Sequence, residues 1–176
     1  MVEREIKLAF ASVDEARGAL LKAGAEMKTP RRLQDDVLYD TAEGALLAKR
    51  SALRLRRDGG RALVTFKGPA AAGPMKMREE IESGVDSGDA MAAMLDALGF
   101  TPCFRYQKYR EEYRAEGVVA AIDETPAGVF VEIEGDETGI RELAGRIGRD
   151  PKDFIVDSYY AVWVKARGER PGDMVF

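Results

Sequence analysis

Apolar and charged residues alternate along many segments of this chain. In the first such segment, residues 2–10, charged residues share one parity at Glu3, Glu5 and Lys7. The positions of the other parity are apolar except for Arg4. A period of two is the pattern of a β-strand, whose successive side chains point to opposite faces. The chain is therefore predicted to begin with a strand that has one charged and one apolar face.

Strand patterns return along the chain and are interrupted by helical patterns. Strands are expected at residues 2–10, 25–41, 75–83, 103–115, 117–124 and 128–134, and in a hairpin at 52–68 that turns at Asp58-Gly59-Gly60. Helices are expected between Ser12 and Gly24, and at 89–98, 138–147 and 157–167. No internal repeat or low-complexity linker divides the sequence. We therefore predict one α+β domain that spans residues 1–176.

The charged face recurs on most of the predicted strands. The residues that share it are Arg54 with Arg56, Thr65 with Lys67, Arg78 with Glu80 and Glu82, Lys108 with Arg110, and Glu132 with Glu134. Water on one face of an antiparallel sheet would explain any single strand. It does not explain why arginine recurs on one strand and glutamate on another. A closed or nearly closed antiparallel barrel does, because side chains of one parity converge on its interior, and helices would then cover the apolar outer face.

Composition narrows the classes of chemistry. The chain has 176 residues, no histidine and one cysteine, Cys103, which excludes a Ser-His-Asp triad, a Cys-His pair and a zinc site. A formal charge of −4 and a pI near 5.1 argue against nucleic acid or an anionic membrane as a partner. There is no apolar run of about 18 residues and no signal-peptide pattern, so a cytoplasmic location is expected.

A charged interior with both signs predicts a particular kind of ligand. Convergent arginine and lysine bind a polyanion through charge-assisted hydrogen bonds. Clustered carboxylates repel a polyanion unless a divalent cation lies between them. A triphosphate together with Mg²⁺ or Mn²⁺ satisfies both sets of residues.

Seven short segments resemble motifs of one protein family and occur in the family's order. They are EREIK at 3–7, LRLR at 53–56, TFKGP at 65–69, REEIE at 78–82, KYREEY at 108–113, IDETPAGVFVEIEG at 122–135 and DSYYAVW at 157–163. The first resembles the ExExK signature of the CYTH domain, the triphosphate tunnel metalloenzymes. That family includes class IV adenylyl cyclases, thiamine triphosphatases and inorganic triphosphatases. The resemblance implies an eight-stranded antiparallel tunnel with helices packed outside it.

The resemblance also implies roles for the charged residues. The residues similar to the family's metal-binding acids are Glu3, Glu5, Glu132 and Glu134, with Asp123 at a second metal position and Glu80 and Glu82 as further acids. The residues similar to its triphosphate-binding cations are Lys7, Arg54, Arg56, Lys67, Arg78, Lys108 and Arg110. Lys67 also resembles the lysine proposed in triphosphatases to help activate water, which requires nearby cations or burial to lower its pKa.

Some residues near these motifs are interpreted as structural. Asp35 and Asp36 are taken as solvated loop acids, and Asp40 is left outside the site. The aromatic residues interpreted as packing are Tyr39, Tyr159, Tyr160 and Trp163. The last three belong to the final helix, which in the family can close one end of the tunnel.

Several functions share this apparatus. Hydrolysis of inorganic tripolyphosphate, thiamine triphosphate or a nucleoside triphosphate is favoured, because it requires no nucleoside pocket. The alternative is a class IV adenylyl cyclase, which converts ATP to cyclic AMP and pyrophosphate and needs a site for adenosine. A non-catalytic binding module would tolerate loss of the acids, which here are complete. The expected state is a monomer or a homodimer.

Overall fold

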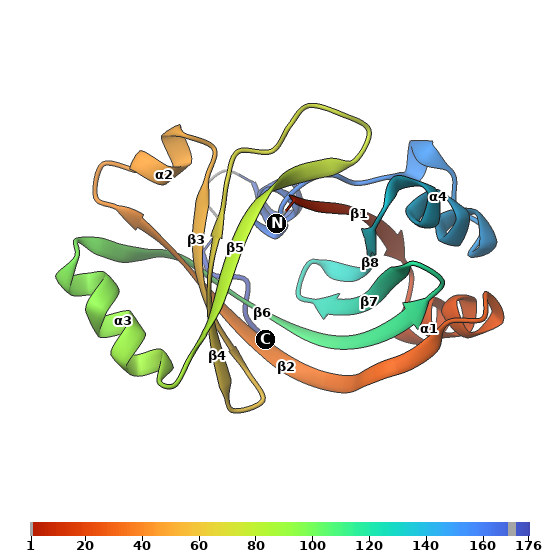
Figure 1. The fold of residues 1–176 in the computed structure, drawn as a ribbon, viewed down its shortest axis with the longest axis horizontal. Coiled ribbons are helices and arrows are strands. Elements are labelled where there is room, and N and C mark those ends of the chain that lie inside the picture. The colour runs from red at the N-terminus through yellow and green to blue at the C-terminus, as the bar shows by residue number, and fades with distance from the viewer. Residues whose placement is uncertain (1, 169–171) are drawn as a thin grey trace.

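The computed structural model describes residues 2–168 and 172–176, and within them the strands close into a barrel (Figure 1). The strands are β1 (Val2–Phe10), β2 (Glu26–Thr41), β3 (Ala52–Asp58), β4 (Arg61–Lys67), β5 (Lys76–Val85), β6 (Phe100–Ala115), β7 (Val118–Thr125) and β8 (Gly128–Gly135). Around the barrel their order is β1-β5-β4-β3-β2-β6-β7-β8, and each neighbouring pair is antiparallel. The predicted eight-stranded barrel is confirmed.

Helices lie outside the barrel or at its ends. They are α1 (Val13–Lys22), α2 (Ala45–Ala48), α3 (Gly88–Ala97), α4 (Glu137–Arg146), the 3-10 turn η1 (Pro151–Asp153) and α5 (Tyr159–Arg167). The four longer helices were predicted, whereas α2 was not. Asp40 supports α2, because its carboxylate accepts hydrogen bonds from the backbone N–H groups of Leu46 and Leu47. Of the described helices, none has both the length and the apolar character needed to cross a membrane.

Local signals in the sequence explain where elements begin and end. The turn between β3 and β4 has positive φ at Gly59 (56°) and Gly60 (87°), the geometry that favours glycine in a two-residue hairpin. Ser12 caps α1 by accepting a hydrogen bond from the Glu15 backbone N–H. The Glu15 carboxylate in turn accepts from the Ala11 backbone N–H.

The strand register brings the charged faces together inside the barrel. Residues directly opposite each other in an antiparallel pair project to the same face. The opposed pairs include Glu3 with Arg78, Lys7 with Glu132, Lys67 with Glu80, and Arg110 with Asp123. The predicted inversion of the barrel, charged within and apolar without, is therefore present.

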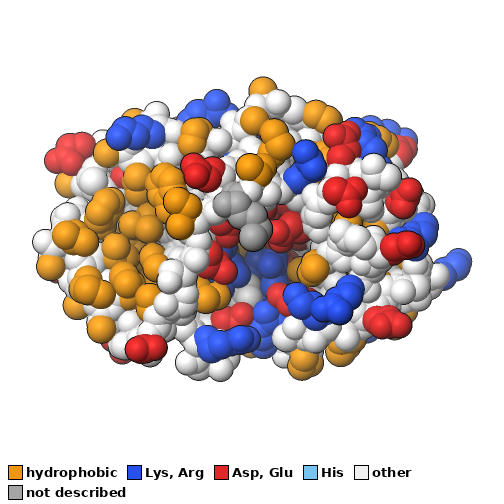
Figure 2. Space-filling view, viewed as in Figure 1, with side chains coloured by type: hydrophobic (Ala, Val, Ile, Leu, Met, Phe, Trp, Pro, Cys, Tyr) orange, Lys and Arg blue, Asp and Glu red, His pale blue; other side chains and the backbone are white. Residues whose placement is uncertain are grey.

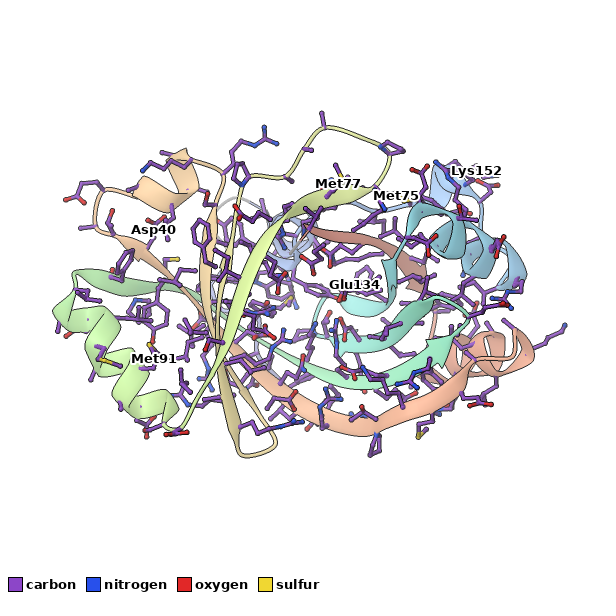
Figure 3. The ribbon with its side chains drawn as sticks, in the orientation of Figure 1. Asp40, Met75, Met77, Met91, Glu134 and Lys152 are labelled. Carbon is purple, nitrogen blue, oxygen red and sulfur yellow. The ribbon has the colours of Figure 1, made fainter. Side chains whose placement is uncertain are left out.

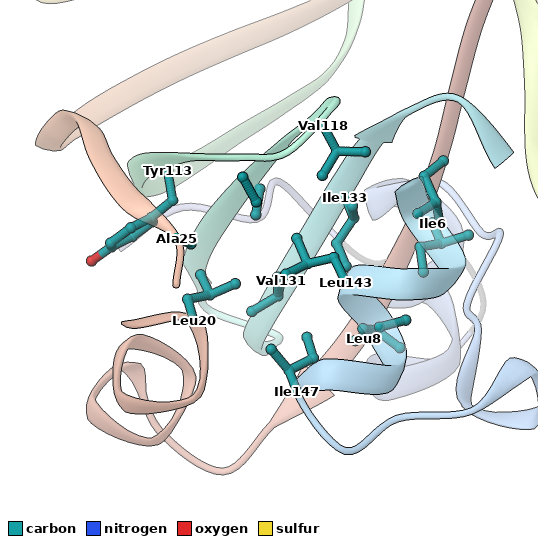
Figure 4. Packing of buried hydrophobic residues seen from close by; sticks show 14 of the residues in the cluster. Ile6, Leu8, Leu20, Ala25, Tyr113, Val118, Val131, Ile133, Leu143 and Ile147 are labelled. Carbon is teal, nitrogen blue, oxygen red and sulfur yellow. The ribbon is translucent and has the colours of Figure 1, made fainter. Parts of the chain in front are cut away.

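The largest apolar core lies outside the barrel, where α1 and α4 cover β1, β7 and β8 (Figure 4). Ile6 and Ile133 from the strands, Leu20 from α1 and Leu143 from α4 are all fully buried there. A second outer cluster, beneath α3, joins Tyr39, Leu55 and Leu95. A third, at one end of the barrel, joins aromatic residues of β6, β8 and α5 with Met174.

Helices do not cover the whole outer face. Ile81 on β5 is 58% exposed, and Leu47 and Leu98 near α2 and α3 are 72% and 73% exposed. Figure 2 shows apolar side chains gathered on the left of the molecule, the side on which Figure 1 places α2 and α3. The expectation of helical cover therefore holds for part of the barrel only.

The buried outer core is expected to provide most of the stability. Leu143→Ala removes a fully buried side chain between α4 and the barrel, and should lower the free energy of unfolding by about 2–5 kcal/mol. Chemical denaturation measures this change. Leu98→Ala is the matched control, with an expected change within about 0.5 kcal/mol because Leu98 is exposed. Equal losses in the two variants would contradict the assignment of the core.

Candidate functional site

The barrel interior holds a cavity of about 1030 Å³. In Figure 2 it is visible as a central hollow with acidic and basic side chains at its floor. Among its lining residues are Glu3, Glu5, Lys7, Arg54, Arg56, Lys67, Arg78, Glu80, Glu82, Lys108, Arg110, Glu132 and Glu134. Every predicted site residue except Asp123 therefore lines one cavity, although these residues come from β1, β3, β4, β5, β6 and β8.

One side of the cavity carries a group of carboxylates from β1, β5 and β8. Glu3 accepts hydrogen bonds from Lys67 Nζ at 2.9 Å and 3.1 Å. Glu5 accepts one from Lys76 Nζ at 2.7 Å. Glu134 forms no hydrogen bond or salt bridge with the described residues, and Figure 3 shows it between β5 and β8. Glu3 and Glu5 are thus paired with ammonium groups, whereas Glu134 is not.

The carboxylate group shows the effect of crowded negative charge. Burial, a hydrogen bond with Glu80 and the charge of Glu5 raise the pKa of Glu3 to about 7. Burial and the charges of Glu5 and Glu80 likewise raise the pKa of Glu134. A divalent cation would relieve this repulsion, and carboxylate oxygens are the ligands that Mg²⁺ and Mn²⁺ prefer.

The carboxylate oxygens are therefore suitable ligands for a hard metal ion, but the carboxylates do not converge on one point. Within residues 2–168 and 172–176, no group of three or more Asp, Glu, Cys or His side chains is gathered closely enough to hold a metal ion. Glu3 and Glu5 are turned toward Lys67 and Lys76 instead. Binding a cation would require these carboxylates to exchange an ammonium partner for the metal.

Across the cavity, β3 presents two arginines that Asp36 of β2 holds in place. Arg56 donates two hydrogen bonds to Asp36, from Nε at 2.7 Å and from Nη2 at 3.0 Å. Arg54 Nε lies 3.7 Å from the same carboxylate, is buried, and donates no hydrogen bond to a described residue. A buried donor without an acceptor is costly, so this nitrogen is suited to a ligand oxygen.

The interpretation of Asp36 as a solvated loop acid was wrong. Asp36 is fully buried, because β2 continues through it and its parity turns it into the barrel. Burial alone would raise the pKa of Asp36, but Arg56 and Arg54 outweigh that effect and lower it to about 2. Asp35 has the opposite parity and forms a salt bridge with Arg105 on the outside.

The third group lies around Asp123, which does not line the cavity. Its carboxylate is fully buried and accepts hydrogen bonds from Arg110 Nε at 2.6 Å and from Lys108 Nζ at 2.8 Å. Arg110 also contacts Glu132, whose other oxygen lies 3.0 Å from Lys7 Nζ. Asp123 therefore lies behind these cations, and its predicted contact with a second metal ion remains a prediction.

Several lining residues were missed in the sequence. They include Lys76, Tyr106 and Glu112. These three lie two residues from Arg78, Lys108 and Arg110, so they share the same parity. Burial and the charges of Lys7 and Arg78 lower the pKa of Lys76 to about 8, although Glu5 opposes this. Extending each alternating pattern by one step would have identified all three.

Comparison with known proteins assigns the family. The CYTH domain model matches residues 1–154. A protein of Methanocaldococcus jannaschii, named as a candidate adenylate cyclase, is 31% identical over 143 residues, which is 81% of each chain. The PH1819 protein of Pyrococcus horikoshii has a similar structure, with a TM-score of 0.76, 27% identity and coverage of 94% of this chain and 99% of the other.

Two further solved structures share the fold. A candidate adenylate cyclase of Vibrio parahaemolyticus has a TM-score of 0.81 and 21% identity, covering 93% of this chain and 98% of that one. A Hippeastrum protein, named as a candidate adenylyl cyclase and described as having a dominant triphosphatase activity, has a TM-score of 0.68 and 20% identity, covering 93% and 95%. The chain belongs to the CYTH domain family, whose members are enzymes that act on triphosphates.

Proposed function

We propose that this protein is a metal-dependent triphosphatase that hydrolyses a triphosphate inside the barrel cavity. The observation that carries the proposal is the presence, in one cavity of the closed barrel, of carboxylates from β1, β5 and β8 opposite arginines and lysines from β3 and β6. Such a cavity complements both the negative charge of a triphosphate and the positive charge of its accompanying cation.

The cations of the cavity would hold the phosphate oxygens. The residues assigned to this role are Lys7, Arg54, Arg56, Arg78, Lys108 and Arg110. Lys7 and Lys108 are 1% and 2% exposed, and in such a poorly hydrated site their attraction to phosphate is stronger than at a surface. Asp36 and Asp123 hold three of the cations, Arg56, Lys108 and Arg110, before substrate arrives, which reduces the cost of ordering them.

The carboxylates would hold Mg²⁺ or Mn²⁺. The residues assigned to this role are Glu3, Glu5, Glu132 and Glu134, with Glu80, Glu82 and Asp123 as further acids. When bound, the ion supplies positive charge against the phosphate oxygens as charge develops in the reaction. Lys67 lies at this side, 2.9 Å from Glu3 and 2.5 Å from Glu80, and we assign it the orientation of the attacking water.

Adenylyl cyclase activity is the second candidate, and the name of the Methanocaldococcus jannaschii relative favours it. In that reaction the ribose 3′-oxygen of ATP attacks the α-phosphorus, and pyrophosphate leaves. The Hippeastrum protein carries a similar name but is described as chiefly a triphosphatase. Since both reactions need the same cations and carboxylates, only the products distinguish them.

The first prediction from this proposal concerns those products. Purified protein with Mg²⁺ or Mn²⁺ should release orthophosphate from tripolyphosphate, thiamine triphosphate or ATP, without cyclic AMP. Phosphate release and nucleotide chromatography measure the two reactions in parallel. Cyclic AMP and pyrophosphate in equal amounts from ATP would instead establish the cyclase. Absence of any product from folded protein would favour a non-catalytic binding module.

The second prediction concerns the metal ligands. Glu134→Gln removes a carboxylate that has no ion pair among the described residues, so folding should be preserved. The Mg²⁺ concentration for half-maximal activity should rise about tenfold or more, because a charged ligand is lost. A titration of activity against Mg²⁺ measures this rise. Glu79→Gln, an exposed residue on the outer face of β5, is the matched control and should leave the titration unchanged.

The expectation for Glu132→Gln is different. Glu132 contacts Lys7, Lys108 and Arg110, so its neutralisation leaves buried cations with less compensating charge. Both activity and the free energy of unfolding should fall. An unchanged Mg²⁺ titration in both glutamate variants would mean that the metal assignment is wrong.

The third prediction concerns Asp36. Asp36→Asn leaves the buried guanidinium of Arg56 without its charged partner, which should lower the free energy of unfolding by about 3–5 kcal/mol. The KM for triphosphate should also rise, because Arg56 loses its fixed position. Asp35→Asn is the matched control, and its half-exposed pair with Arg105 should contribute about 1 kcal/mol or less. Equal effects of the two substitutions would refute the role of Asp36.

A further inference from the structure

Tyr159, the first residue of α5, extends from the closing helix to the charged site. Its side chain is buried and lines the cavity. The phenolic hydroxyl donates a hydrogen bond of 2.6 Å to Asp123 Oδ2. Tyr106 and Phe130 pack beside the ring, with centroids 6.0 Å and 5.9 Å away. The residue therefore has both a packing contact and a polar contact inside the barrel.

The carboxylate that accepts the hydrogen bond from Tyr159 also binds two cations of the site. Asp123 Oδ2, which accepts from Tyr159, also accepts from Lys108 Nζ at 2.8 Å and from Arg110 Nη2 at 2.6 Å. The carboxylate is fully buried, so protein donors take the place of water around it. Loss of one donor would leave the Asp123 oxygen with fewer hydrogen bonds, and Lys108 and Arg110 would be held less firmly.

The face of the ring makes two more contacts with the same set. Lys7 Nζ lies 5.1 Å and Lys108 Nζ 4.9 Å from the ring centroid, within the range of cation–π attraction. One aromatic side chain thus contacts two ammonium groups and the carboxylate that binds a guanidinium.

We propose that Tyr159 is a positioning residue, through which α5 fixes Lys7, Lys108 and Arg110 for binding the triphosphate. The inference rests on the proposed function, since these cations are assigned to the substrate there. A residue that only packed against the barrel would require an apolar ring, and phenylalanine would serve. The hydrogen bond from the hydroxyl and the contacts of two lysines with the ring are additional to packing. Through them, α5 would influence the affinity of the site for its substrate.

The test compares two substitutions of Tyr159. Tyr159→Phe keeps the ring and removes the hydroxyl, whereas Tyr159→Leu removes both the hydrogen bond and the ring contacts. The Kd of tripolyphosphate is measured by titration calorimetry in EDTA, and KM and kcat are measured with Mg²⁺. Tyr159→Phe should raise Kd and KM about tenfold with little change in kcat, the size expected for one hydrogen bond to a charged group. Tyr159→Leu should raise them further.

Trp163→Phe is the matched control on the same helix. Trp163 belongs to the same apolar cluster as Tyr159 and donates a hydrogen bond to the Gly172 carbonyl, but it does not line the cavity. The Trp163→Phe substitution should lower the free energy of unfolding and leave the Kd and KM for tripolyphosphate unchanged. If Tyr159→Phe binds tripolyphosphate like the natural chain, or weakens binding no more than Trp163→Phe does, the inference is overturned.

The inference and the proposed function can fail separately. A natural chain that binds tripolyphosphate but releases orthophosphate from none of tripolyphosphate, thiamine triphosphate and ATP would refute the triphosphatase, while the comparison of Kd values would still decide the role of Tyr159. A natural chain that hydrolyses tripolyphosphate, with Tyr159 variants of unchanged KM, would refute the inference alone. A chain that does not bind tripolyphosphate and hydrolyses none of the three triphosphates would refute both.

Discussion

Charge compensation inside a closed barrel is the constraint on which the structure depends. A charged side chain removed from water is costly unless an opposite charge or a hydrogen bond replaces its hydration. The antiparallel register supplies such partners, since it places Lys7 opposite Glu132 and Lys67 opposite Glu80. The charges on each strand therefore restrict which side chains can face inward on its neighbouring strands. The interior tolerates many charges because several of them meet an opposite charge on a neighbouring strand.

The same inversion separates stability from function. The apolar residues of β1, β7 and β8 face outward and are buried by α1 and α4, so hydrophobic stabilisation comes from outside the barrel. The interior contributes little apolar burial, and its residues can serve ligand binding. An exposed outer face near α2 and α3 shows that this cover is incomplete.

A feature of this structure could be predicted from the sequence when residues close together in the chain determine it. Alternation with period two assigned residues such as Glu3, Arg54 and Lys108 to one face, because parity is a local property of a strand. The four-residue helix α2 was missed, since it is too short to show a helical period. Asp36 was missed because the pair of aspartates was interpreted as a loop, although the strand predicted at 25–41 includes both of them. Tyr159 was interpreted as packing because its polar partner, Asp123, lies 36 residues away in the chain.

Aspartate and glutamate have different positions inside the barrel, and the difference follows from the lengths of their side chains. Asp36 and Asp123 face inward, are fully buried, and hold arginines and lysines from behind. Glu3 and Glu134 also face inward but line the cavity. Aspartate is one methylene shorter than glutamate, so its carboxylate stays near the barrel wall, where it binds the charged end of a neighbouring cation. Glutamate extends farther toward the axis, where a ligand would lie. In this barrel, the two fully buried aspartates thus hold cations from behind, whereas Glu3 and Glu134 face the cavity.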